Sequence, residues 1–135
     1  GGLIPLRYKL TTHQGKASDS ECARFGVEAV TRPIVLRDFA RLPGAAKEGV
    51  FMNVDNAEPF LITAKPADDG NGIIVRIQNV TEKEETCGIK FPELNPVSAA
   101  LVDPVEVDKG KLDLKDRGLV CKVPGRAVQS VRIVF

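Results

Sequence analysis

The sequence predicts a mostly β protein: an antiparallel β-sandwich with one short helix near the N-terminus. Apolar and polar residues alternate in many short runs, as they do in half-buried strands. Glycine, proline, asparagine and aspartate separate these runs at short intervals, which is typical of a sandwich or barrel. Because each run has one apolar face, two sheets must pack face to face to keep those faces out of water.

The first part of the chain, residues 1–45, is predicted to be the end of a larger β-sandwich region: a strand, a short helix, a second strand and a linker. Leu6, Tyr8 and Leu10 alternate with basic residues, which predicts the first strand. The run "IVLRDF" predicts the second strand. The stretch "ARLPGAAKEG" has no clear period and contains glycine and proline, so it is the predicted linker.

The helix is predicted over residues 18–30. Ser18 precedes Glu21 by three positions, the spacing of a capping box, in which each side chain binds a free backbone N–H at the helix start. Apolar residues follow at helical spacing, and Pro33 stands where proline commonly follows a helix end.

The rest of the chain, residues 46–135, is predicted to be a small C-terminal β-sandwich. Its expected strands lie in the runs "VFMNVD", "FLITAKPA", "IIVRIQNV", "TCGIKF", "AALVDPVEV", "KLDL", "LVCKV" and "VQSVRIVF".

Within this part, the stretch 60–85 predicts two strands joined by a tight turn. Phe60, Ile62 and Ala64 are expected on one face of the first strand. In the second strand, Val75 and Ile77 are expected in the core, with the intervening Arg76 and the following Gln78 on the other face. The turn "DDGNG" suits a hairpin because aspartate, asparagine and glycine tolerate positive φ angles.

Composition limits the classes of function. The 135 residues suit one domain, or one compact domain with an added segment, and 43% hydrophobic with 27% charged residues indicates a folded chain with a polar surface. A net charge of +1 gives no reason to expect a nucleic-acid partner. The apolar runs are too short for a membrane span, and the start has no signal segment, so we expect neither a membrane partner nor secretion. The opening, which begins directly on a strand, predicts a fragment of a longer chain whose two glycines come from cloning.

The three cysteines, Cys22, Cys87 and Cys121, form neither a disulfide framework nor a zinc motif, because they are odd in number and lie far apart. We therefore expect buried free thiols in a reducing compartment and a cytoplasmic protein.

The sequence nominates no catalytic, cofactor-binding or metal-binding residue. His13 is the only histidine and is expected in a turn, with no nucleophile or carboxylate near it for a triad. The turn "DDGNG" lacks the alternating ligands of a calcium loop, and "TEKEE" is expected to be a solvated loop. "NVT" at 79–81 fits the glycosylation pattern, but we expect Asn79 simply to end a strand. Aromatic residues make up 5% of the chain with no tryptophan, so stacking platforms for sugars or bases are scarce.

The order of these runs resembles the β-rich C-terminal part of family 38 glycoside hydrolases, the α-mannosidases. "LRYKLTTHQG" followed by "RPIVLRDF" is similar to that family's "Tyr-Ala-Leu, two residues, His-x-Gly" strand and the segment after it. "PFLITAKPADDGNGIIVRIQNVT" is similar to its strand, acid-acid-Gly-x-Gly hairpin and Val-Arg-apolar-x-Asn strand. "AALVDPVEV" resembles its Leu-x-Glu-x-apolar bend. "VPGRAVQSVRIVF" resembles its last strand, with Ser130 and Arg132 in the places of threonine and arginine. The departures are "GRAV", where the family often has an aromatic residue and glutamate, and "HQGKAS", which lacks an aspartate and an aromatic residue.

The resemblance implies a domain without its own catalytic site. Family members carry a zinc ion and an aspartate nucleophile, with a retaining mechanism, in an N-terminal α/β barrel, and none of that barrel's motifs occurs here. The expected partner is therefore the N-terminal catalytic barrel of the same parent chain, with zinc in the parent enzyme and no cofactor in this fragment.

Self-association through Leu3 to Leu10, or pairing of this strand with the domain's own sheet, is a further expectation, because a strand severed from its sheet leaves an open edge. Two alternatives remain open at this stage: an autonomous carbohydrate-binding module and a free-standing protein-interaction sandwich.

Overall fold

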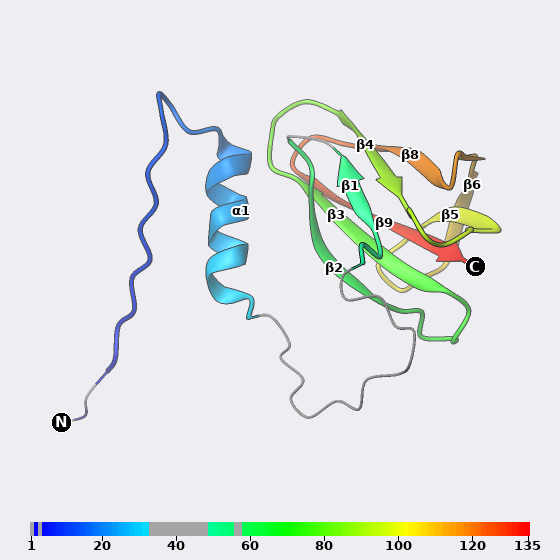
Figure 1. The fold of residues 1–135 in the computed structure, drawn as a ribbon, viewed down its shortest axis with the longest axis horizontal. Helices are drawn as coiled ribbons and strands as arrows, with labels where there is room; N and C mark the ends of the chain where they lie inside the picture. The colour runs from blue at the N-terminus through cyan, green and yellow to red at the C-terminus, as the bar shows by residue number, and fades with distance from the viewer. Residues whose placement is uncertain (1, 3, 33–48, 56–57) are drawn as a thin grey trace.

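The computed structural model describes residues 2, 4–32, 49–55 and 58–135. Within these ranges the chain forms one helix and nine strands (Figure 1). The helix is α1 (Asp19–Val30). The strands are β1 (Asn53–Asp55), β2 (Phe60–Pro66), β3 (Ile73–Asn79), β4 (Glu85–Lys90), β5 (Ser98–Val102), β6 (Asp108–Leu112), β7 (Leu114–Lys115), β8 (Gly118–Val123) and β9 (Ala127–Val134).

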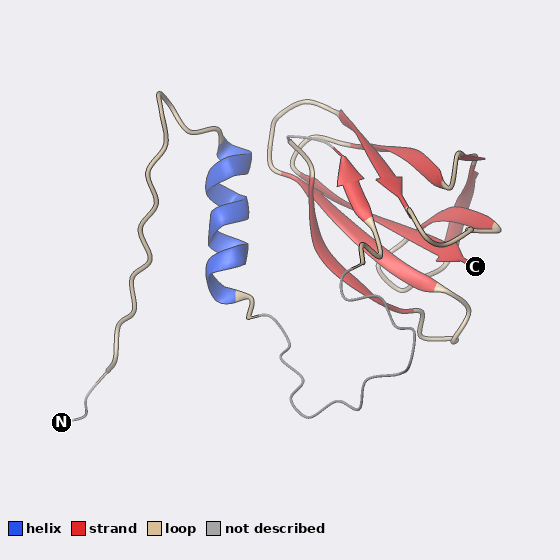
Figure 2. Cartoon of the chain, viewed as in Figure 1, coloured by secondary structure: helices blue, strands red, loops and turns tan. Residues whose placement is uncertain are grey.

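The strands make two antiparallel sheets, so the predicted sandwich is confirmed (Figure 2). The smaller sheet has the order β1-β4-β8-β7 and the larger has the order β2-β3-β9-β5-β6. Every strand pair is antiparallel. The predicted boundary near residue 45, the linker and the "IVLRDF" strand fall wholly or largely outside the described residues.

The core lies between the two sheets. It is built from aliphatic side chains, one aromatic ring and two thiols whose relative exposure is at most 6%. Its members are Val75, Ile77, Cys87, Ile89, Phe91, Ala99, Leu119, Cys121, Val123, Val131 and Ile133. At one end, the ring of Phe91 packs edge-on against Phe51 and Phe135, with centroid distances of 6.0 and 5.0 Å.

The register of β3 confirms the predicted faces of that strand. Val75 and Ile77 lie opposite Val131 and Gln129 of β9 and are fully buried between the sheets. Arg76 lies on the opposite, outer face of the larger sheet, as the alternation of side chains requires.

The predicted face of β2 is wrong in part. A register shift between Leu61 and Thr63 interrupts the strand, so Phe60 lies opposite Gln78 whereas Ala64 lies opposite Val75. Phe60 and Ala64 therefore belong to opposite faces. An extra residue in one strand changes the side that later residues face, and alternation alone does not reveal it.

The hairpin predicted at "DDGNG" is confirmed. The N–H of Gly70 donates to the carbonyl of Ala67, and the N–H of Ala67 donates to the carbonyl of Gly72. Gly70 and Gly72 have φ angles of 74° and 87°, which glycine adopts without strain. A Cβ atom on Gly72 would also collide with the carbonyl oxygen of Ile133.

The helix is confirmed together with its capping box. The Ser18 hydroxyl accepts from the N–H of Glu21, and the Glu21 carboxylate accepts from the N–H of Ser18. These bonds lower the pKa of Glu21.

The first predicted strand is not formed: the described residues between 4 and 12 carry no strand. Ile4, Leu6, Tyr8 and Leu10 are all more than 70% exposed. Figure 1 shows this segment running beside α1 and apart from the sandwich. The ammonium group of Lys9 donates to the carbonyl of Ala29 over 2.5 Å. Alternation indicates a strand only when another strand supplies its hydrogen bonds, and the described part of the chain supplies none here.

Candidate functional site

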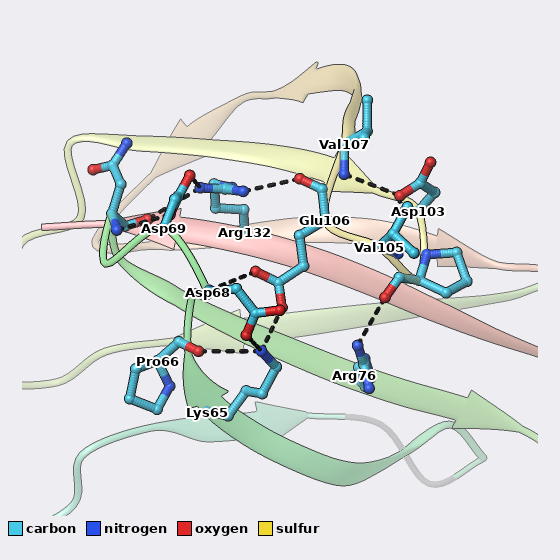
Figure 3. Close-up of polar contacts among 12 residues, drawn as sticks. Lys65, Pro66, Asp68, Asp69, Arg76, Asp103, Val105, Glu106, Val107 and Arg132 are labelled. Carbon is cyan, nitrogen blue, oxygen red and sulfur yellow. Dashed lines mark hydrogen bonds and ion pairs between the residues drawn. The ribbon is translucent and has the colours of Figure 1, made fainter.

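The most organised polar region is the outer face of the larger sheet, where the loop 103–107 between β5 and β6 folds back across the strands (Figure 3). Beneath it lies a small apolar cluster of Ala67, Ile74 and Val102, separate from the main core. The loop meets the β2–β3 hairpin above this cluster. We call residues 103–107 the 103–107 loop.

Glu106 anchors the loop. Its residue exposure is 7%, and its backbone has a φ of 68°, which is uncommon for a residue with a side chain. The carboxylate forms an ion pair with Lys65 and accepts a hydrogen bond of 2.8 Å from the N–H of Asp68. A single side chain therefore ties the loop to both β2 and the hairpin.

Two arginines from the sheet hold the backbone of the loop. Arg132 of β9 donates to the carbonyl of Glu106 over 2.9 Å and to the carboxylate of Asp69 over 2.5 Å. Arg76 of β3 donates to the carbonyl of Pro104 over 3.1 Å. The "acid-acid-Gly" turn is thus joined to β9 and to the loop by the same guanidinium group.

Asp103 organises the loop internally. Its carboxylate accepts hydrogen bonds from the N–H groups of Val105 and Val107, at 3.1 and 2.9 Å. It also pairs with Lys109 over 3.0 Å. This pattern of an aspartate binding nearby backbone N–H groups is common in tight turns.

The contacts stabilise the ionised form of each carboxylate. The ion pair with Lys65, and then the N–H of Asp68, hold the pKa of Glu106 below its ordinary value. The N–H of Asn71 and then Arg132 lower the pKa of Asp69. The N–H of Val107 and then Lys109 lower the pKa of Asp103. A proton donor for glycoside hydrolysis has a raised pKa, so these carboxylates have the opposite character.

The carboxylates of the "DDGNG" turn thus attach the turn to β2 and β9. The sequence did not suggest this arrangement. Glu106 was missed because it stands between two valines, in a pattern typical of a strand. The signal that could have found it is the resemblance of "AALVDPVEV" to a bend containing a glutamate.

The other residues weighed from the sequence lie apart from this cluster. His13 is exposed beside a bend at residues 14–15. Asn79 ends β3 as expected, and its side chain is 1% exposed, donating to the carbonyls of Lys83 and Val123. In the "TEKEE" loop, Glu82 pairs with Arg126 over 2.6 Å.

The three cysteines are unpaired, and the expectation of buried thiols holds for two of them. Cys87 and Cys121 face each other across β4 and β8, and burial raises their pKa values to about 12 and about 11. Cys22 is exposed on α1, so the expectation is wrong there. The helix leaves part of its surface uncovered, which spacing alone did not show.

A groove of about 790 Å³ crosses the outer face of the smaller sheet. Asp55 and Lys90 line it from β1 and β4, while Lys115 and Val120 line it from β7 and β8. Its lining contains no aromatic side chain among the described residues, which is unfavourable for stacking on sugar rings.

Two features are absent from the described residues. These residues bring together no group of three or more histidine, cysteine, aspartate or glutamate side chains that could hold a metal ion. None of their helices is long and apolar enough to cross a membrane.

Comparison with known proteins gives one match. Residues 60–133, from the start of β2 almost to the end of β9, match the family model described as "Glycosyl hydrolases family 38 C-terminal beta sandwich domain". No curated protein and no solved structure matches the chain. The match covers more than half of the 135 residues, including both strands and the turn of the hairpin and the whole 103–107 loop. The chain therefore belongs to the family of glycosyl hydrolases family 38 C-terminal β-sandwich domains.

Proposed function

We propose that this chain is the non-catalytic C-terminal β-sandwich domain of an α-mannosidase-like glycoside hydrolase. The observation that carries the proposal is the family match over residues 60–133. In this proposal the domain packs against an N-terminal barrel of the same parent chain, and that barrel holds the zinc ion and hydrolyses α-mannosides.

The carboxylates of the outer face support a structural role for this domain. Glu106, Asp69 and Asp103 are each engaged by cations and backbone N–H groups within the domain. A carboxylate held ionised in this way is a poor proton donor. The unpaired cysteines support a reducing, cytoplasmic environment for the enzyme.

The test is to express the complete reading frame of the parent gene and assay hydrolysis of an aryl α-mannoside with and without a zinc chelator. We expect zinc-dependent activity of the full protein and none of the 135-residue chain, with or without added zinc. A reading frame without a barrel, or an inactive full protein, would refute the proposal. Turnover by the 135-residue chain that is lost in Glu106→Gln would refute its non-catalytic role.

We also propose that the 135-residue chain self-associates through residues Leu3 to Leu10, of which Leu3 lies outside the described residues. The side chains of Leu6 and Tyr8 are 71% and 81% exposed on an extended segment, and covering such side chains is favourable by roughly 25 cal/mol per Å². Light scattering at increasing protein concentration should show dimers or larger species.

The matched control for self-association is an exposed apolar residue elsewhere. The double variant Leu6→Ser and Tyr8→Ser should be monomeric, whereas Val97→Ser, at a 69% exposed position between β4 and β5, should associate like the wild type. A wild-type chain that stays monomeric at all concentrations would contradict this proposal without touching the first.

A further inference from the structure

The turn between β2 and β3 contains two residue pairs of the same chemical kind. In "DDGNG", Asp69 precedes Gly70 and Asn71 precedes Gly72. In each pair the backbone nitrogen of the glycine can attack the side-chain carbonyl carbon of the residue before it and close a five-membered succinimide ring. The attack is intramolecular, and glycine has no side chain to hinder it. By sequence alone, both pairs are therefore open to this reaction.

The structure protects the first pair (Figure 3). The Asp69 carboxylate accepts from the N–H of Asn71 over 2.9 Å and from Arg132, and both contacts lower its pKa. An ionised carboxylate resists attack, because its negative charge repels a nucleophile. The attacking nitrogen is also engaged, since the N–H of Gly70 donates to the carbonyl of Ala67 over 2.9 Å.

The second pair has neither protection. Asn71 is exposed, and within the described part of the chain its side-chain amide has no hydrogen-bond partner. Gly72 accepts a bond at its carbonyl from the N–H of Ala67, but its own N–H has no partner among residues 2, 4–32, 49–55 and 58–135. The carbon that is attacked and the nitrogen that attacks it are thus both available in the folded state, without local unfolding.

The packing of β9 requires a glycine in this pair. A Cβ atom on Gly72 would lie 2.2 Å from the carbonyl oxygen of Ile133, and the φ of 87° also favours glycine. Asn71, by contrast, is not among the residues with a positive φ, so its backbone does not require asparagine. The pair therefore joins a glycine that the fold needs to an asparagine that can be replaced.

We propose that Asn71 is a site of spontaneous deamidation in the folded domain, whereas Asp69 in the same turn is protected. The nitrogen of Gly72 loses its proton and forms a bond to Cγ of Asn71, and the side-chain nitrogen leaves as ammonia. Water then opens the succinimide at one of its two carbonyl carbons and yields aspartate or isoaspartate. The reaction consumes one water and releases one ammonia, with no oxidant or reductant. This proposal does not depend on the function proposed above.

The product changes the attachment of the turn to β9. Asn71 donates through its N–H to Asp69, and its carbonyl accepts from Arg132 over 3.4 Å. Isoaspartate adds one methylene to the backbone between these two groups, so the two bonds cannot both keep their geometry. Either product also adds a carboxylate near Asp69, and the formal net charge of the chain falls from +1 to 0.

The test compares each site with itself in the folded and in the urea-unfolded 135-residue chain. Both samples are kept in mildly alkaline buffer. Peptide mapping by mass spectrometry, with separation of aspartate from isoaspartate, measures conversion at residues 69 and 71. We expect Asn71 to react in the folded chain at no less than about one tenth of its unfolded rate, and Asp69 to react at less than about one tenth of its own.

A matched variant controls for the chemistry of the side chain. Asn71→Gln keeps an amide at this position, but its attack needs a six-membered ring, so the amide should persist throughout. Fresh wild type and Asn71→Gln should melt at the same temperature, because the side chain of Asn71 makes no hydrogen bond within the described residues. The acidic form of the wild type, isolated by ion exchange, should melt at a lower temperature than both.

Equal slowing of both sites on folding would overturn the proposal, because the reaction would then proceed through the unfolded chain. Slowing of Asn71 by more than about tenfold would overturn it as well. Reaction of Asp69 at its unfolded rate would refute the protection of the first pair. An acidic form that melts together with the fresh protein would refute the changed attachment of the turn.

Discussion

On its inner face the larger sheet packs aliphatic side chains against the smaller sheet, whereas on its outer face a loop and a set of ion pairs cover it. The inner residues Val75 and Ile77 belong to the buried apolar core. On the outer face, Ile74 lies below Glu106, Lys65 and Arg132. Burial between the sheets does not depend on pH, while the outer cover depends on the ionisation of its carboxylates. The contribution of the inner face of this sheet to stability is thus independent of pH, whereas the contribution of its outer face depends on pH.

The largest expected effect tests the assignment of the two faces. Val75→Asp places an unpaired charge between the sheets and should cost about 3–5 kcal/mol of unfolding free energy. Gln78→Asp, on the outer face of the same strand, should be mild because Gln78 is only partly buried. Urea unfolding followed by circular dichroism measures both. If the two variants are equally stable, the assigned register is wrong.

A pair of cavity-forming variants compares the two apolar clusters directly. Ile77→Ala in the main core should cost about 2–5 kcal/mol, in the upper half of that range. Ile74→Ala should cost less, because the 103–107 loop above it can settle into the space while two packed sheets cannot. Urea midpoints and m-values report the difference. A cost at Ile74 equal to that at Ile77 would show that the outer cluster is as rigid as the core.

The pH dependence of stability tests the ionised carboxylates on the outer face of the larger sheet. The folded-state pKa values of Glu106, Asp69 and Asp103 are lowered, so their contributions are present at neutral pH. They are lost as the pH falls from the unfolded-state values of about 4 through the lowered folded-state values. Glu106→Gln should therefore lower the Tm by several degrees at pH 7, with a difference from wild type that disappears toward pH 2. Thermal melts at stepped pH values measure this.

The control for that experiment is Glu93→Gln, which changes an exposed glutamate outside the cluster. Its melting curve should follow the wild type at every pH. A Glu106→Gln deficit that stays constant from pH 7 to pH 2 would indicate a packing effect and not the loss of a charge.

The smallest expected effect concerns an exposed ion pair that does not cover an apolar cluster. Lys122 lies 3.1 Å from Glu84 on the smaller sheet, and the two side chains are 75% and 53% exposed. Lys122→Ala should change the unfolding free energy by about 0–1 kcal/mol, because exposed pairs are screened by water and salt. If Lys122→Ala lowered the unfolding free energy nearly as much as Ile74→Ala, ion pairs that cover an apolar cluster would not differ from ion pairs that lie exposed on the surface.

The sequence predicted the inner face better than the outer. Alternation in β3 placed Val75 and Ile77 correctly because the inner faces of both sheets are simple apolar surfaces. It failed in β2, where the irregularity after Leu61 is a backbone feature with no signal in the side chains.

The ion-pair cluster on the outer face was not predictable because its partners come from three separate stretches of the chain: the β2–β3 hairpin, the 103–107 loop and β9. Lys65, Asp69, Glu106 and Arg132 each stand in an ordinary local context, and only the tertiary fold brings them together. The first strand was predicted but is not formed among residues 4–12, since alternation says nothing about whether a neighbouring strand is present.

The position of Tyr8 has an optical consequence. The chain contains no tryptophan, and Tyr8 is its only tyrosine, 81% exposed on the N-terminal segment and apart from the sandwich. Intrinsic fluorescence excited near 280 nm therefore comes from a ring that does not sense the packing of the two sheets. A melting curve followed by fluorescence would be nearly flat while the sandwich unfolds. The same emission would change when another surface covers the segment. The fluorescence of Tyr8 therefore reports on assembly of the chain but not on unfolding of the sandwich.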